Sequence, residues 1–120
     1  GDIVLLSGNL GAGKTTFMQF FGATLGVKEK MASPTFVLEK IYPISKKDFD
    51  KLIHIDAYRI DDPKEMLAIG WEEIVKDPRN IICVEWADKI EHLFPEHFVR
   101  IDLAHLEGEK REISIRDSQA

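Results

Sequence analysis

The residues best suited to chemistry lie near the start of the chain. Residues 8–15 read G-N-L-G-A-G-K-T, a complete G-x-x-x-x-G-K-[ST] phosphate-binding loop between an apolar run and a helical segment. Glycines let backbone N–H groups converge on phosphate oxygens. We expect Lys14 to reach the β- and γ-phosphates of a nucleoside triphosphate, and the Thr15 hydroxyl to ligate Mg²⁺. The predicted nucleotide-binding residues are Asn9, Leu10, Gly11, Ala12, Gly13, Lys14, Thr15, Thr16 and Trp86.

Two apolar runs, residues 52–56 and 81–85, each end in an acid, Asp56 and Glu85. Triphosphate chemistry needs a carboxylate for Mg²⁺ or its water shell, and another group to orient the attacking water. We favour Glu85 for the metal because its run is more uniformly apolar, which is typical of a central strand. Asp56 is then a candidate for positioning water or for a second metal contact. The sequence leaves these two roles interchangeable.

Two further side chains are candidates for the same site. Thr35 follows Ser33 and Pro34 after the first helix, where many phosphate-loop proteins carry a nucleotide-sensing loop. It would contact Mg²⁺ or the γ-phosphate there, and a plain turn explains the same residues equally well. Trp86 would stack on a base or face a partner, although burial in the core is the commoner outcome for tryptophan.

The elements that must position these residues alternate between strand and helix, which indicates an α/β domain with a mainly parallel central sheet. In such sheets ligands bind beyond the carboxyl ends of the strands, so the loop, Asp56 and Glu85 should converge on one pocket. We expect helices at 14–25, from the cap residue Asp62 to about Gly70, and at 88–94. The expected strands are 3–6, 36–42 (ended by Pro43), 52–56 and 81–85. Residues 44–51 should form a polar connection, and 98–103 with 112–116 a closing hairpin.

Composition limits the function classes. The 120 residues suit one domain, and a net charge of −5 argues against direct binding of DNA or tRNA. No apolar stretch is long enough to cross a membrane, and the single cysteine, Cys83, allows no disulfide within the chain. This fits a cytoplasmic protein. The chain has no N-K-x-D segment to read guanine and no arginine-rich lid, which favours ATP over GTP and lowers the case for a small-molecule kinase.

Four motifs in this order resemble the bacterial ATPase family of tRNA threonylcarbamoyladenosine biosynthesis, the TsaE family. They are the phosphate loop, S-P-T-F at 33–36, H-I-D-A-Y-R at 54–59 and E-W at 85–86. The resemblance implies a P-loop NTPase-like three-layer sandwich with a C-terminal β-hairpin. It also implies a cytoplasmic, Mg²⁺-dependent ATPase of low intrinsic activity. Partner proteins of the TsaD and TsaB type, which bring the tRNA, would activate it.

The same resemblance implies roles for single residues. Thr15 and Glu85 would hold Mg²⁺, Thr35 would belong to a switch loop, Asp56 would matter for hydrolysis and Trp86 would lie near the nucleotide. The chain departs from the family at Asn9, where an acid is common. Family members usually carry a segment of a few tens of residues before the loop strand, and we expect residues 1–120 to lack it.

Two functions of different classes follow. In the first, residues 1–120 form a P-loop ATPase domain whose hydrolysis drives the tRNA-modifying complex. In the second, ATP binding alone docks the domain onto its partners, and turnover is incidental.

Overall fold

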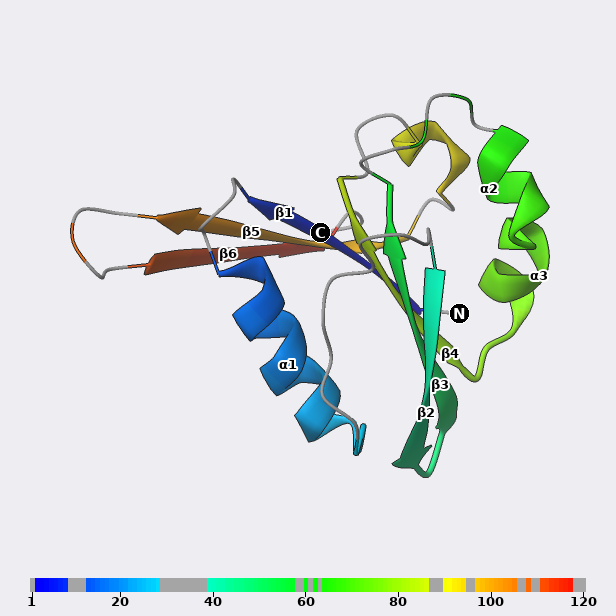
Figure 1. The fold of residues 1–120 in the computed structure, drawn as a ribbon, viewed down its shortest axis with the longest axis horizontal. Coiled ribbons are helices and arrows are strands. Elements are labelled where there is room, and N and C mark those ends of the chain that lie inside the picture. The colour runs from blue at the N-terminus through cyan, green and yellow to red at the C-terminus, as the bar shows by residue number, and fades with distance from the viewer. Residues whose placement is uncertain are drawn as a thin grey trace.

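A mixed β-sheet with helices on both faces positions the candidate residues (Figure 1). The computed structural model describes residues 2–8, 13–28, 39–57, 60, 62, 64–86, 90–94, 97–105, 108 and 111–117. Its strands are β1 (Asp2–Gly8), β2 (Glu39–Lys46), β3 (Phe49–Asp56), β4 (Asn80–Glu85), β5 (Val99–His105) and β6 (Arg111–Asp117). Its helices are α1 (Lys14–Thr24), α2 (Lys64–Ala68), α3 (Trp71–Lys76) and the 3₁₀ turn η2 (Glu91–Leu93).

Six strands of the described chain form one sheet in the order β2-β3-β4-β1-β5-β6. The four inner strands run parallel, and the outer strands β2 and β6 pair antiparallel with β3 and β5. The carboxyl ends of β1, β3, β4 and β5 therefore meet at one edge of the sheet. The antiparallel pairing of β5 with β6 agrees with the closing hairpin expected from the sequence.

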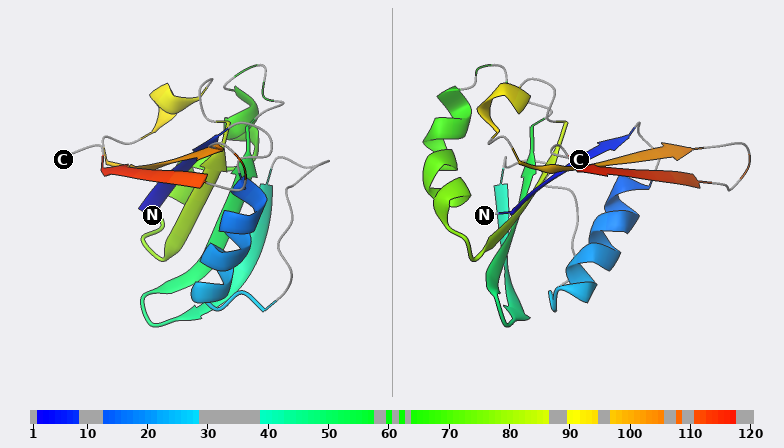
Figure 2. Two further views of the ribbon diagram at one scale, coloured as in Figure 1. Left: turned by 90° about the vertical axis from the view of Figure 1, so that its left-hand side faces the viewer. Right: turned by 180° about the vertical axis from the view of Figure 1, so that it is seen from behind.

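Both faces of the sheet are covered, as Figure 2 shows: α1 lies on one face, and α2 and α3 lie on the other. Every residue of β4 is buried, which explains why residues 81–84 form a continuous apolar run instead of an alternating one. One core cluster joins Ile53, Ile55, Ile82 and Val84 to α2 and α3. The other joins Leu52 and Cys83 to Met18 of α1.

The i, i+4, i+8 spacing of Phe17, Phe21 and Leu25 predicts that they face the core, and all three do pack against it. The fully buried apolar side chain of α1 is nevertheless that of another residue, Met18. Met18 is 1% exposed, and its sulfur lies 3.1 Å from the Cys83 sulfur, whereas the three expected residues are only partly buried. The contact of α1 with the sheet therefore includes Met18 in addition to the phenylalanines and Leu25.

Residues 44–51 are not a connection, and this part of the sequence prediction was wrong. They belong to a hairpin in which β2 continues through Pro43 to Lys46 and β3 already begins at Phe49. Pro43 is tolerated because β2 is an edge strand with an irregular register between Pro43 and Lys46. Tyr42 and Ile44 are buried while Ile41 is exposed, the alternation of a strand with one covered face.

Other local predictions agree with the structure. The Lys64 N–H donates to the Asp62 side chain at 2.9 Å, so Asp62 caps α2. Gly26 and Gly70 adopt left-handed φ angles of 89° and 80° after α1 and α2. In the expected 88–94 helix only η2 is helical among the described residues, and Asp88 lies outside them, as do residues 36–38. None of the described helices is long and apolar enough to cross a membrane.

Candidate functional site

The two predicted carboxylates lie side by side at the carboxyl edge of the sheet. Asp56 is directly opposite Glu85 in the parallel pairing of β3 with β4, and the Ala57 N–H donates to the Glu85 carbonyl at 2.9 Å. Glu85 also pairs with Leu6 of β1, the strand that leads into the phosphate loop. The structure therefore brings Asp56, Glu85 and the end of β1 to one corner, as the sequence predicted.

Lys14 points into this corner from the start of α1. Gly13 precedes it with φ 96°, a left-handed conformation that favours glycine and turns the chain into the helix. Lys14 is only 8% exposed. Burial lowers its pKa, and the negative charges of Glu85 and Asp56 oppose this shift without cancelling it. A poorly hydrated ammonium group between a helix N-terminus and two carboxylates is well placed to bind phosphate oxygens.

The ring of Trp86 packs against the ammonium group of Lys14. The Lys14 Nζ atom lies 3.8 Å from the centre of the Trp86 ring, close enough for a cation–π interaction. Trp86 directly follows β4 and has φ 58°, an uncommon angle for a bulky residue and one that occurs preferentially at functional sites. The ring is partly buried, so Trp86 is neither a core residue nor fully exposed.

His54 contacts Glu85, a relationship that the sequence analysis missed. The His54 Nε2 atom lies 2.7 Å from Glu85 Oε2, and both side chains are almost completely buried. The signal lay in the strand alternation, because residues 54 and 56 face the same side of β3 as Cys83 and Glu85 do on β4. Cys83 adds no ligand there, since burial raises the pKa of its thiol and keeps it protonated.

Several predicted site residues cannot be placed. Residues 9–12 and Thr35 lie outside the described residues, as does the side chain of Thr15. Thr15 and Thr16 belong to the first turn of α1, where Thr16 is exposed. The predicted contacts of Thr35 and of the Thr15 hydroxyl with Mg²⁺ stay predictions.

The carboxylates in this corner suit a Mg²⁺ ion that is shared with a nucleotide better than they suit a metal ion bound only by protein side chains. Among the described residues, no group of three or more His, Cys, Asp and Glu side chains gathers as a metal cage. Asp56 and Glu85 supply hard carboxylate oxygens at adjacent strand ends. Mg²⁺ in nucleotide sites takes one or two carboxylates and completes its shell with phosphates and water. The site would therefore accept the metal together with a nucleotide.

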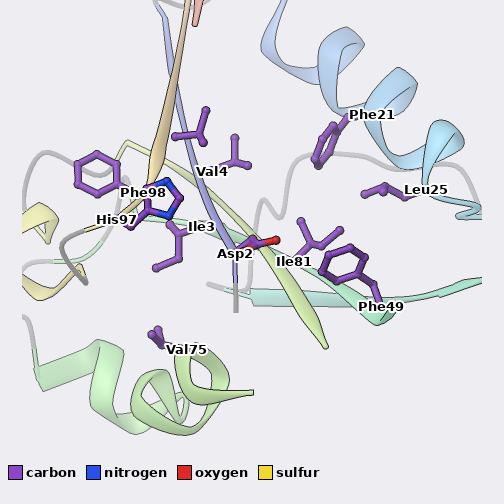
Figure 3. Close-up of a pocket in the computed structure, with 11 residues that line it drawn as sticks. Asp2, Ile3, Val4, Phe21, Leu25, Phe49, Val75, Ile81, His97 and Phe98 are labelled. Carbon is purple, nitrogen blue, oxygen red and sulfur yellow. The ribbon is translucent and has the colours of Figure 1, made fainter. Parts of the chain in front are cut away.

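A separate apolar hollow of about 690 Å³ lies at the opposite ends of the same strands (Figure 3). Its lining includes Ile3 of β1, Ile81 of β4 and Val99 of β5, residues near the start of each strand. Phe21 of α1 and Val75 of α3 close it from the two faces of the sheet. It differs chemically from the charged corner because its lining is mostly apolar, apart from Asp2 and His97.

Comparison with known proteins decides the family. The family model "Threonylcarbamoyl adenosine biosynthesis protein TsaE" matches residues 1–113. The chain belongs to the TsaE family. It is 39% identical over 115 residues to the tRNA threonylcarbamoyladenosine biosynthesis protein TsaE of Rickettsia prowazekii, covering 95% of this chain and 76% of the relative. The Bacillus subtilis TsaE protein is 37% identical over 114 residues, covering 95% of this chain and 68% of the relative.

A solved structure has a similar fold. The crystal structure of Bacillus subtilis YdiB superposes with a TM-score of 0.65 at 30% identity, over 96% of this chain and 67% of that one. The match over residues 1–113 establishes the family that the four motifs suggested, and the YdiB structure supports the mixed α/β fold.

Proposed function

We propose that this chain binds Mg²⁺-ATP at the corner formed by Lys14, Asp56 and Glu85 and hydrolyses it in support of threonylcarbamoyladenosine formation in tRNA. The observation that carries the proposal is the convergence of a desolvated lysine with two carboxylates at the end of a phosphate-loop strand. The TsaE family supplies the pathway, because its members are named for that modification. The fold would then be that of a P-loop NTPase.

Each residue has a distinct task in this proposal. Lys14 and the N-terminus of α1 neutralise the β- and γ-phosphates. Glu85 and the Thr15 hydroxyl would hold Mg²⁺, which would supply positive charge to offset the negative charge on the phosphate oxygens. Asp56, opposite Glu85, orients the attacking water, with Thr35 as the alternative.

The modification itself is assigned to partners of the TsaD and TsaB type. The chain carries 21 acidic against 16 basic residues, a net negative balance that opposes direct binding of the tRNA polyanion. The tRNA is therefore held by the partner complex in the cytoplasm, and the ATPase, slow alone, is stimulated there.

A second candidate, the nucleotide-gated assembly module, is favoured by the position of Lys14 on the Trp86 ring. ATP phosphates have to draw Lys14 away from that ring, so binding alone changes the shape of this corner. In this alternative the changed surface docks onto the partners without hydrolysis.

An Asp56→Ala variant separates the two candidates. Its ATP affinity, measured by calorimetry, should stay within about threefold of the parent because Asp56 is not placed on the phosphates. If hydrolysis is the function, this variant should fail to support threonylcarbamoyladenosine formation in a reaction reconstituted with partners and tRNA. Full modification with Asp56→Ala would favour the assembly module, and a parent chain that binds no ATP would contradict both.

A further inference from the structure

The side chain of His54 contacts the carboxylate of Glu85, the candidate metal ligand. We propose that His54 is a positioning residue: its Nε2–H holds Oε2 of Glu85, so that the Glu85 carboxylate is fixed in the orientation that binds Mg²⁺. The inference rests on the proposed function, in which Glu85 is a metal ligand. It assigns to His54 a role that the sequence motif does not define.

The contact is short and shielded from water. The distance from His54 Nε2 to Glu85 Oε2 is 2.7 Å, and the two side chains are 2% and 3% exposed. They come from adjacent parallel strands, with His54 opposite Cys83 and Glu85 opposite Asp56. Two central strands thus set the geometry, which makes the contact far more rigid than a pair of surface side chains.

The hydrogen-bonding pattern of the ring favours one tautomer. A carboxylate only accepts hydrogen bonds, so Nε2 carries the proton. Nδ1 is buried and finds no hydrogen-bond partner among the described residues. His54 therefore donates a single, directed hydrogen bond to Glu85.

The bond leaves Glu85 suited to a metal. His54 engages only Oε2, so Oε1 is not committed to the histidine. Carboxylates that ligate metals are commonly held in this way by outer hydrogen bonds, and loss of such a partner costs about 10- to 100-fold in metal affinity. Lys14, whose pKa is influenced by the charge of Glu85, is assigned to the phosphates in the proposed function, whereas His54 has no assigned contact with the nucleotide and can keep its bond to Glu85 when nucleotide is bound.

A matched pair of variants tests the positioning role. In His54→Gln the amide nitrogen reaches about the place of Nε2 and keeps the donor, whereas in His54→Asn the amide is one carbon too short to reach Glu85. Both variants bury a polar amide, so their costs to folding are comparable. Ile53→Val, a buried neighbour on the other face of β3, serves as the control for general loosening of the strand.

The readout is the Mg²⁺ requirement of ATP binding, measured by calorimetry with EDTA and across a series of MgCl₂ concentrations. His54→Asn should leave the affinity in EDTA within about twofold and raise the half-maximal Mg²⁺ concentration by about 10- to 100-fold. His54→Gln and Ile53→Val should stay within about threefold of the parent. An unchanged Mg²⁺ requirement in His54→Asn would overturn the positioning role. So would a loss of ATP affinity that is equally large in EDTA and in MgCl₂. A parent chain whose ATP affinity ignores Mg²⁺ would instead contradict the proposed function on which the inference rests.

Discussion

The ammonium group of Lys14 rests on the indole of Trp86, with 3.8 Å between Nζ and the ring centre. The contact connects Lys14, at the end of the phosphate loop, with Trp86, the first residue after β4. A cation–π interaction of this kind contributes about 0.5–2 kcal/mol, depending on how far water is excluded. ATP phosphates form stronger charge-assisted hydrogen bonds with lysine, so nucleotide binding should break the contact.

Breaking this contact should be visible in tryptophan fluorescence. Titration with ATP should change the emission of the parent chain, because the cation leaves the Trp86 ring. Trp71 should contribute little, since it is 3% exposed and lies in the core beside α2. A Trp86→Phe variant is the control, and a signal of unchanged size in this variant would show that Trp86 does not report on the nucleotide.

The pKa of Lys14 predicts how ATP affinity depends on pH. Burial lowers this pKa from 10.5 in the free protein, and bound phosphates should raise it again. ATP binding then takes up a proton once the pH exceeds the lowered pKa, so affinity should fall as the pH rises toward 10.5. Calorimetry across alkaline pH measures this, and Lys14→Arg, which stays charged, should flatten the profile. An equally steep fall in Lys14→Arg would place the titrating group elsewhere.

The same shift has a consequence for folding. A lysine with a lowered pKa binds its proton less tightly in the folded state than in the unfolded one. Between the lowered pKa and 10.5 the unfolded chain therefore holds more protons, and the contribution of Lys14 to stability rises with pH across this window. Lys14→Met should remove this contribution, as urea unfolding at several alkaline pH values would show. Identical pH slopes for Lys14→Met and the parent would contradict it.

The β2–β3 hairpin predicts a stability difference between two isoleucines of the same strand. Ile44 is 8% exposed and packs in the core, whereas Ile41 is 48% exposed. Ile44→Ala should lower the free energy of unfolding by about 2–4 kcal/mol, and Ile41→Ala by less than about 1 kcal/mol. Urea denaturation measures both. Equal, small losses would mean that residues 44–51 are the loose connection that their polar sequence suggested.

The sequence was informative where chemistry demands particular residues at fixed spacing. The phosphate loop required a strand and a helix around it, and an apolar run ending in an acid located the ends of β3 and β4. From these patterns the meeting of Lys14, Asp56 and Glu85 followed, because parallel strands end at one edge.

The features that the sequence did not reveal depend on tertiary context. Proline usually ends a strand. β2 continues through Pro43 because it lies at the edge of the sheet. His54 and Glu85 are 31 residues apart in sequence, and the register between β3 and β4 is what brings them into contact. The burial of Met18 depends on its contact with Cys83 of the sheet, which the helical spacing alone does not reveal.

The most direct test of the proposed function is phosphate release from Mg²⁺-ATP, measured with and without the partner complex, beside Lys14→Ala as the blank. The proposal predicts slow release by the chain alone, a marked increase when the TsaD- and TsaB-type partners and tRNA are added, and neither with Lys14→Ala. Release that never exceeds the Lys14→Ala blank, even with the complete complex, would contradict hydrolysis as the function of this site.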